Sequence, residues 1–493
     1  MTLVPGPPKA SKVAVAPARR CAYAVLRRVF EQGAFAERAL RAEARSLPGR
    51  DLRLATRLAY GAVQRRRTLD HFAEALSGRS ITRLEAPVLA ALRLGLYELV
   101  YLAGAPDRAV VADNVELAKT GSRAGHGLVN AVLRRAAREG ADSLLSGLAE
   151  DTPEQAALKH SHPTWVARMW WEQLGADAAR ALMECDNQPS ELALRANTLV
   201  MDAPALADRL MSEASGSARE APAASGRRGA GTRQALNVHL DAEIPEAVVV
   251  EGPFDVHGSP LWRDGAFIAQ SRASMLAARC VAPRPGDRVL DLCAAPGGKT
   301  THLAALMGAR GELVAVERDR RRAGELASTL RRMGAGNVRI ELADAAVPLA
   351  GEGTFDRVLV DPPCSGLGTL QARPDKRWRV TAEDVEQMAS AQAAILAAGA
   401  RALRPGGVLV YSTCTISAIE NERVVAAFLA SRDGFTLDDL AAELPAYTQP
   451  PRARAEWAGA LVAARSSSTG STVLTLPHRD RTAGFFIARL RKA

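Results

Sequence analysis

The stretch DRVLDLCAAPGGKTT, residues 287–301, passes from a short apolar strand through a turn of small residues into a helix. Val289 and Leu290 belong to the strand, and helical character begins again at Lys299. Small side chains in such a turn let the backbone approach a ligand, and the free N–H groups of the helix start face it. This stretch therefore predicts a binding site for a nucleotide-type cofactor.

Two glycine patterns that bind phosphate are both incomplete here. A P-loop of the form GxxxxGKT would need glycine at position 293, where the chain has Cys293. The dinucleotide pattern GxGxxG is absent as well, which weakens the case for an NAD enzyme. S-adenosylmethionine is a sulfonium nucleoside without phosphate groups, so it can bind without either pattern. The turn therefore predicts S-adenosylmethionine as the cofactor.

Residues 263–493 alternate between strands and helices. The predicted strands are 288–292, 311–317, 337–342, 355–361, 406–413 and 484–490, and the predicted helices are 298–307, 320–333, 381–403 and 418–431. This alternation is typical of a mostly parallel, doubly wound α/β sheet of the Rossmann-like kind, with ligands at the carboxyl ends of the strands. Acids occur at or just after these ends: Asp291, Glu317, Asp344 and Asp361. Acids that recur at the carboxyl ends of successive strands indicate an adenosine-type ligand.

Cysteines follow the fourth and fifth predicted strands, Cys364 in DPPCSG and Cys414 in YSTC. Cysteine is often a core residue, but two at strand ends that face the cofactor cleft favour catalysis. Methylation of an exocyclic nitrogen would favour an aromatic residue after the two prolines, to stack the base. The chain has Cys364 at that position.

Two cysteines fit methylation of carbon-5 of cytosine, which is a poor nucleophile. A thiolate that adds at carbon-6 makes an enamine that can attack the methyl group from carbon-5. Loss of the carbon-5 proton and elimination of the thiol complete the reaction. One cysteine would lie under the ring, and the second would help to deprotonate or release the adduct. This chemistry alone leaves open which of the two attacks.

The front of the chain is of a different kind. Residues 1–17 read as a flexible basic tail, and residues 18–148 show helical spacing of apolar residues, which predicts an all-α bundle. Residues 149–262 predict a small α+β module that helps to hold RNA, with a strand at 191–200, a helix at 204–214 and a low-complexity insertion at 215–233. Residues 260–271, which lead into the catalytic half, are strand-like. Four arginine clusters on the bundle favour a face that binds nucleic acid: Arg19–Arg20, Arg27–Arg28, Arg65–Arg67 and Arg134–Arg135.

The bulk composition agrees with a polyanionic partner, because the formal net charge is +10. The six cysteines include no CxxC pair, so we expect neither a disulfide framework nor a metal site. The most apolar segment, 88–103, contains Arg93 and Glu98, so it is a better candidate for a buried helix than for a membrane span. We expect a soluble, cytoplasmic monomer.

The motifs of the catalytic half resemble the RsmB/Sun branch of the NOP2/Sun RNA cytosine-5 methyltransferases. They are DLCAAPGGKT (291–300), VERD (316–319), LADA (342–345), VDPPCSGLGTL (360–370) and YSTCTISAIENE (411–422). The bundle resembles a NusB-like RNA-binding domain, and its matching segments are FAERAL (35–40), TRLAYGAVQRRRTLD (56–70), LRLGLYELVYL (92–102), AVVADNVELAK (109–119) and GLVNAVLRR (127–135). Such a front domain separates RsmB-like proteins from other members of the family.

The resemblance implies an S-adenosylmethionine-dependent class I methyltransferase that modifies a specific cytosine of small-subunit (16S) ribosomal RNA. It implies that Cys414 is the nucleophile and that Cys364 assists release of the product. Asp361 is then expected near the methyl donor and the target base, with Lys299 orienting it or a backbone phosphate. The insertion at 215–233 departs from the family pattern and leaves the shape of the middle module open.

The same resemblance implies the residues that contact the cofactor and the RNA. The cofactor residues are Cys293, Ala294, Ala295, Pro296, Gly297, Gly298, Lys299, Glu317, Asp344 and Asp361, with Glu317 at the ribose and Asp344 beside the adenine. The arginine clusters predict Arg65, Arg66, Arg67, Arg134 and Arg135 as RNA-binding residues. The NusB-like resemblance implies that Gly127, Asn130, Arg134 and Arg135 contact RNA or the next domain.

Two alternatives stay open. The chain could be an RNA-binding or antitermination factor whose methylase half is vestigial, although the intact cysteine pair and acid set argue against this. Transfer RNA could be the substrate, and only the family analogy of the NusB-like domain argues against it.

Overall fold

The computed structural model describes residues 15–220, 236–347, 352–449 and 471–493. The chain divides into two compact units, and the second contains Met169–Ala372 and Arg379–Ala493. The first contains the residues up to Arg168 together with a short later segment, 373–378. Among the helices of the described residues, none is both long enough and apolar enough to cross a membrane.

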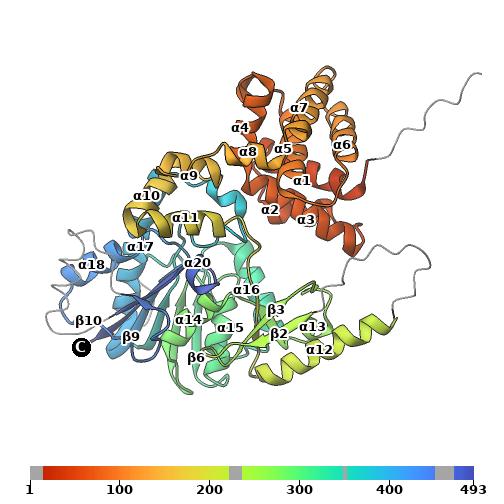
Figure 1. The fold of residues 1–493 in the computed structure, drawn as a ribbon. Helices are drawn as coiled ribbons and strands as arrows, with labels where there is room; N and C mark the ends of the chain where they lie inside the picture. Colours follow the sequence, from red (N-terminus) through yellow and green to blue (C-terminus); the bar gives the residue numbers. More distant parts are fainter. Residues whose placement is uncertain (1–14, 221–235, 348–351, 450–470) are drawn as a thin grey trace, which may run out of the picture. The chain divides into compact units, whose positions relative to one another are not determined.

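The first unit is a bundle of helices, coloured red to orange in Figure 1. Its helices are α1 (Pro17–Glu31), α2 (Ala36–Glu43), α3 (Gly49–Gln64), α4 (Arg66–Ser77), η1 (Ile81–Arg83), α5 (Ala86–Tyr101), α6 (Asp107–Lys119), α7 (His126–Glu139), α8 (Ala141–Ser146) and α9 (Pro153–Lys159). The segment 373–378 adds the 3-10 helix η2 (Pro374–Trp378), where Trp378 Nε1 donates a hydrogen bond of 2.7 Å to Val63 O. The predicted all-α bundle is confirmed.

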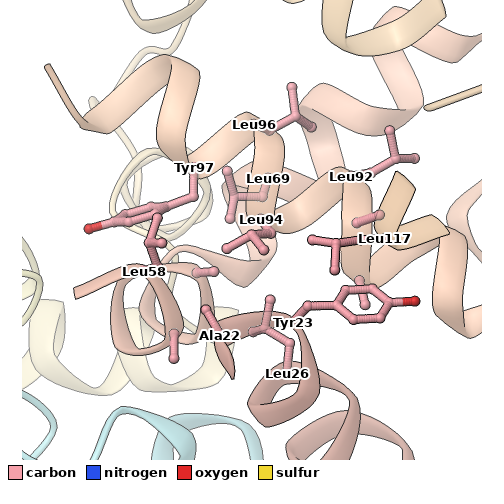
Figure 2. Close-up of a cluster of buried hydrophobic side chains, with 14 of the residues drawn as sticks. Ala22, Tyr23, Leu26, Leu58, Leu69, Leu92, Leu94, Leu96, Tyr97 and Leu117 are labelled. Atoms are coloured by element: carbon pink, nitrogen blue, oxygen red, sulfur yellow. The ribbon is translucent and has the colours of Figure 1, made fainter. Parts of the chain in front are cut away.

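Helix α5 is the centre of this bundle and is buried on almost every side. Figure 2 shows its leucines packed among side chains of the surrounding helices, and the labelled cluster consists of Ala22, Tyr23, Leu26, Leu58, Leu69, Leu92, Leu94, Leu96, Tyr97 and Leu117. The ring of Tyr97 lies against α3 at Gly61, where a Cβ atom would be 1.9 Å from Cζ of the ring. This close approach therefore requires glycine.

The two charged residues of α5 are buried with partners. Arg93 Nε donates a hydrogen bond of 2.6 Å to Asp70, and Glu98 accepts one of 2.8 Å from Arg19 Nε. Buried charges are tolerated when they are paired in this way, so α5 can carry both in the core. Arg19 consequently belongs to the interior of the bundle, although its cluster with Arg20 suggested a basic face.

The second unit contains a nine-stranded sheet in the order β11-β12-β13-β9-β8-β5-β6-β7, with β10 paired to β13. Its strands are β5 (Arg288–Leu292), β6 (Glu312–Val316), β7 (Val338–Glu341), β8 (Phe355–Val360), β9 (Leu403–Thr413), β10 (Phe435–Leu437), β11 (Thr448–Gln449), β12 (Thr472–Thr475) and β13 (Phe485–Lys492). Strands β9, β8, β5, β6 and β7 run parallel, and β13 joins β9 antiparallel. The doubly wound α/β sheet is confirmed.

Helices cover both faces of this sheet. They are α14 (Arg272–Val281), α15 (Gly298–Leu306), α16 (Arg320–Arg332), α17 (Ala382–Ala402), α18 (Glu422–Ser431) and α20 (Pro477–Asp480). Val289 and Leu359 belong to the core that includes residues of α14, α15 and α16. On the other face, Val358 and Val360 approach Gly399 of α17 so closely that a Cβ atom there would lie 2.8 Å from Val360. Because successive residues of a strand face opposite sides, both helix layers pack on apolar side chains.

The second unit also holds a smaller antiparallel sheet, ordered β2-β3-β1-β4. Its strands are β1 (Leu192–Ala196), β2 (Asn237–Leu240), β3 (Ala247–Glu251) and β4 (Phe267–Ala269), and the helices that pack on them are α12 (Ala203–Glu220) and α13 (Pro260–Arg263). Two helices precede this sheet in the chain: α10 (Thr164–Leu174), whose first residues belong to the first unit, and α11 (Ala176–Cys185). The predicted α+β character of this region is confirmed. The predicted domain boundaries stay a prediction.

Three details differ from the sequence-based expectation. The strand expected at 191–200 ends at Ala196, because Asn197 Oδ1 accepts the N–H of Leu199 at 3.3 Å and starts a turn. The strand expected at 260–271 is split into α13 and the short strand β4. Helix α12 continues to Glu220, and the rest of the insertion at 215–233 lies outside the described residues.

Candidate active site

The turn between β5 and α15 is tied together by Asp291. Its Oδ2 accepts a hydrogen bond of 2.6 Å from Thr300 Oγ1, which joins the end of the strand to the first turn of the helix. Burial raises the pKa of Asp291 to about 7. Cys293 and Gly297 both have left-handed backbone, with φ of +67° and +103°. At Gly297 a Cβ atom would also lie 2.9 Å from Leu326, so the turn needs glycine there.

The acid after β6 has one occupied and one available carboxylate oxygen. Glu317 is only 3% exposed, and its Oε1 accepts the N–H of Asp319 at 2.9 Å. Its buried Oε2 accepts no hydrogen bond within the described part of the chain, and the nearest cation, Arg322, lies 3.4 Å away. Asp344, after β7, is exposed and accepts the N–H of Ala346 at 2.9 Å. Oε2 of Glu317 can therefore accept a hydrogen bond from a hydroxyl group of a ligand.

Asp361 follows β8 and is held from two sides. Lys299 Nζ donates a hydrogen bond of 2.7 Å to its Oδ2, and Ser412 Oγ donates one of 3.0 Å to its Oδ1. Burial alone would lower the pKa of Lys299, but the charge of Asp361 and the hydrogen bond to it raise that pKa above its usual value. Sequence reasoning missed Ser412, although it lies two residues before Cys414 and therefore on the same side of β9.

The two cysteines meet at the carboxyl ends of β8 and β9. Cys364 Sγ lies 3.2 Å from Cys414 Sγ, and both side chains are half-buried. All six cysteines of the chain lie in the described residues, and all are thiols. The N–H of Gly368 donates a hydrogen bond of 3.0 Å to Cys414 O, which joins the loop after β8 to the end of β9. Cys414 also interacts electrostatically with Lys299.

The strand order arranges these residues in a row. Cys414 follows β9, Asp361 follows β8, the turn at 293–297 follows β5, Glu317 follows β6 and Asp344 follows β7. These five strands are parallel neighbours, so their carboxyl ends lie along one edge of the sheet. The site residues expected in the catalytic half are therefore brought together at that edge.

The arginines expected to contact RNA lie in the first unit and have different surroundings. Those at Arg65–Arg67 are half-buried: the guanidinium of the first lies 4.5 Å from the ring centroid of Tyr101, and burial lowers the pKa of the other two. Arg134 and Arg135 are exposed on α7. The arginine triplet is thus largely engaged within its own unit. The pair on α7 is more exposed, and Arg135 also donates hydrogen bonds to Glu139 at 2.8 Å and to Leu76 O at 3.2 Å.

Comparison with known proteins agrees with the two-part architecture. Residues 278–491 match the family model described as 16S rRNA methyltransferase RsmB/F, and residues 16–138 match the NusB family. A probable ribosomal RNA small subunit methyltransferase B from Synechocystis is 32% identical over 97% of this chain and 99% of its own length. The chain belongs to the RsmB/F family of 16S rRNA methyltransferases.

Further relatives of this RsmB/F family member match between 70% and 98% of the chain. A probable ribosomal RNA small subunit methyltransferase B from Bacillus subtilis is 31% identical over 89% of this chain and 90% of its own length. The crystal structure of PH0851 covers 98% of this chain and 100% of its own, with a TM-score of 0.74 and 25% identity. A methyltransferase homologue from Pyrococcus horikoshii covers 70% of this chain and 100% of its own, with a TM-score of 0.55 and 25% identity. The resemblance seen in the motifs is thereby confirmed.

Proposed function

We propose that this RsmB/F family member is an S-adenosylmethionine-dependent methyltransferase that modifies carbon-5 of a cytosine in 16S ribosomal RNA through a covalent adduct with Cys414. The observation that carries the proposal is the pair of sulfur atoms, 3.2 Å apart at the ends of two parallel strands. Next to them, Asp361 is ionically paired with Lys299. A nitrogen or oxygen methyltransferase has no need for two thiols at this place.

The edge of the sheet fits S-adenosylmethionine. The buried Oε2 of Glu317 lacks a hydrogen bond among the described residues and can accept from a ribose hydroxyl, while the turn at 293–298 carries little side-chain bulk. Asp344 would lie beside the adenine and Asp361 beside the methyl-bearing end. When bound, the cofactor supplies an electrophilic methyl group. The chain's own residues bind it, orient it and activate the base.

Cys414 would attack carbon-6 of the cytosine as a thiolate. The ammonium group of Lys299 interacts with Cys414 and stabilises negative charge on the sulfur, which is the form that attacks. As the carbon–sulfur bond forms, the electron pair of the 5,6 double bond moves to make carbon-5 nucleophilic. Carbon-5 would then take the methyl group, whose bond to the donor's sulfur breaks and leaves its electron pair on that sulfur. Asp361, which Lys299 and Ser412 hold by hydrogen bonds, would bind the polar edge of the base.

Cys364 would serve the second half of the reaction. After methyl transfer, carbon-5 carries both a methyl group and a proton, and the proton must go to a base. The electron pair of the broken carbon-5–hydrogen bond restores the 5,6 double bond. The carbon–sulfur bond to Cys414 then breaks, and its electron pair returns to the sulfur. Cys364 lies within 3.2 Å of the departing sulfur, so it can accept or relay a proton there.

The helical unit would hold the RNA. The exposed arginines of α7, Arg134 and Arg135, can contact phosphates, and the partly buried triplet Arg65–Arg67 would contribute less. The target cytosine has to be accessible or flipped out, because both faces of its ring must be reached by sulfur and methyl group. Small-subunit ribosomal RNA as the substrate follows the names of the relatives.

Bisulfite mapping of ribosomal RNA tests the proposal directly. RNA from cells with and without the gene is compared, and the expected result is one cytosine of 16S rRNA that is protected only when the gene is present. Transfer RNA is mapped in the same samples. If only transfer RNA contains a protected cytosine, transfer RNA is the substrate instead of 16S rRNA, and the proposed reaction at carbon-5 still holds. If no cytosine changes in either RNA, the proposal is wrong. Titration of the protein with S-adenosylmethionine separates an active enzyme from a vestigial methylase.

A further inference from the structure

A buried carboxylate lies behind the two cysteines. Glu420, in the loop between β9 and α18, is fully buried, and its Oε1 accepts the backbone N–H of Ser365 at 2.8 Å. Its Oε2 accepts a hydrogen bond from Ser365 Oγ. Ser365 is the residue directly after Cys364, so both oxygens of Glu420 hold the loop that carries this cysteine. Sequence reasoning gave Glu420 no role.

The same serine connects this loop to the other cysteine. Ser365 Oγ lies 2.7 Å from Thr415 Oγ1, and Thr415 directly follows Cys414. The two hydroxyls therefore bridge the residues next to the two cysteines, and Glu420 fixes the orientation of the bridge. All three side chains are fully buried, so no water competes for these hydrogen bonds.

Two further residues hold the carboxylate from behind. Gln392 of α17 donates from Nε2 to Glu420 Oε1 at 3.0 Å and lies 2.9 Å from Pro363 O, the carbonyl just before Cys364. Tyr411 of β9 donates from its hydroxyl to the backbone carbonyl of Glu420 at 2.6 Å. Glu420 is thus linked to β9, to α17 and to the loop after β8. Burial raises the pKa of Glu420, which favours its neutral form.

We propose that Glu420 is a positioning residue that keeps Cys364 and Cys414 in contact by holding Ser365 against Thr415. A buried acid is costly unless its hydrogen bonds are satisfied, and those of Glu420 go to the two cysteine loops and to the helix that supports one of them. The hydrogen bonds of the Glu420 carboxylate given above go to Ser365 and Gln392, so its proposed effect on the sulfur atoms is indirect. Its importance for catalysis rests on the proposed function, whereas its control of the cysteine spacing does not.

The spacing can be measured without the RNA reaction. Diamide oxidises two neighbouring thiols to a disulfide and is itself reduced to the hydrazine by the two electrons and two protons that the thiols give up. In the full-length protein, the rate at which Cys364 and Cys414 become linked, followed by mass spectrometry of the joined peptides, reports how often the sulfurs meet. Cytosine methylation of 16S rRNA is measured on the same preparations.

Glu420→Ala is expected to slow the disulfide formation by roughly tenfold or more and kcat by roughly 100-fold, because thiols that are misplaced by about 1 Å react poorly. The KM for S-adenosylmethionine should stay as in the wild type, because Glu420 lies outside the cofactor residues. Glu420→Gln should restore most of both rates. Its amide oxygen can accept from Ser365 N and Gln392, and its amide nitrogen can donate to Ser365 Oγ.

Two more variants make the result decisive. Glu443→Ala removes a carboxylate of the same unit that pairs with Arg489, and both rates should remain at the wild-type value. Thr415→Val removes only the hydroxyl at the other end of the bridge and should slow both rates, so the test stands even if Glu420→Ala fails to fold. Wild-type disulfide rates in Glu420→Ala, or in Thr415→Val when the former does not fold, would overturn the positioning role. Full activity of Cys414→Ala would overturn the proposed function and leave the spacing result untouched.

Discussion

Lys299 Nζ and Asp361 Oδ2 lie 2.7 Å apart and join the cofactor turn to the end of β8. Lys299 belongs to the first turn of α15, after β5, and Asp361 belongs to the loop that leads to Cys364. The ion pair therefore crosses from the residues that would hold the cofactor to those that would act on the base. It fixes the distance between the two halves of the site.

Lys299→Met is expected to lower the rate of methyl transfer on the order of 100-fold, because Asp361 would lose its charged partner and turn away from the base. Methyl transfer to 16S rRNA is measured with radiolabelled cofactor. Lys119→Met, which removes an exposed lysine of α6, serves as the control. An unchanged rate in Lys299→Met would show that the ion pair has no part in the reaction.

Cys414→Ala is expected to abolish methyl transfer and to leave the affinity for S-adenosylmethionine unchanged, because the thiol attacks the base and does not contact the ribose or adenine. Calorimetric titration gives the affinity, and methylation assays give the activity. Cys280→Ala is the matched control, since Cys280 is a buried thiol of α14 in the core of the same unit. Turnover by Cys414→Ala would exclude it as the nucleophile.

Cys364→Ala is expected to accumulate a covalent complex between Cys414 and the RNA, because attack and methyl transfer proceed while release is impaired. A denaturing gel of protein incubated with 16S rRNA and cofactor should show a band that shifts with the RNA. The double variant Cys364→Ala/Cys414→Ala should show none. If the single variant Cys364→Ala also shows no shifted band, the result argues against a release role for Cys364.

Glu317→Gln is expected to weaken S-adenosylmethionine binding by roughly 10- to 100-fold, the loss of a hydrogen bond to a charged group. The amide keeps the shape of the side chain but replaces one acceptor oxygen by a donor. Calorimetric titration of the full-length protein measures the change, and Glu325→Gln on the exposed side of α16 is the control. Equal affinities for the wild type and Glu317→Gln would place the ribose elsewhere.

Much of the fold and the cofactor edge could be predicted because the signals are local. The strand, the small-residue turn and the helix at 287–301 are consecutive in the sequence, and parallel strands bring their ends to one edge. The acids at these ends therefore identify the edge before any contact is known. Cys364 and Cys414 could be placed by the same rule.

The parts that could not be predicted depend on contacts between distant residues. Ser365 and Glu420 are 55 positions apart, and nothing in the sequence shows that their side chains meet. Arg19 looks like part of a basic face, yet it is buried in the core, where it pairs with Glu98, 79 positions away. Asp291 resembles the other acids at strand ends, but Thr300 occupies its carboxylate within the turn.

Asp291 should make the stability of the protein fall as pH rises. Burial raises the pKa of its carboxyl from the usual 3.8 to about 7, so between these values the folded chain binds a proton that the unfolded chain releases. Stability is then fully present below the unfolded pKa and is lost as pH rises through the folded pKa. Asp291→Asn stays neutral and can still accept the hydrogen bond of Thr300 through its amide oxygen.

Relative to the wild type, Asp291→Asn should therefore gain on the order of 2–4 kcal/mol of stability between about pH 4.5 and about pH 8. Urea unfolding midpoints at the two pH values measure this difference. Asp356→Asn is the control, because hydrogen bonds and the charge of Arg404 outweigh burial and lower the pKa of Asp356. Its effect should be the same at both pH values, since Asp356 is ionised throughout that range in both states. If the stability difference between Asp291→Asn and the wild type is also the same at both pH values, the buried carboxyl keeps its ordinary pKa. Thr300 would then donate its hydrogen bond to a charged carboxylate.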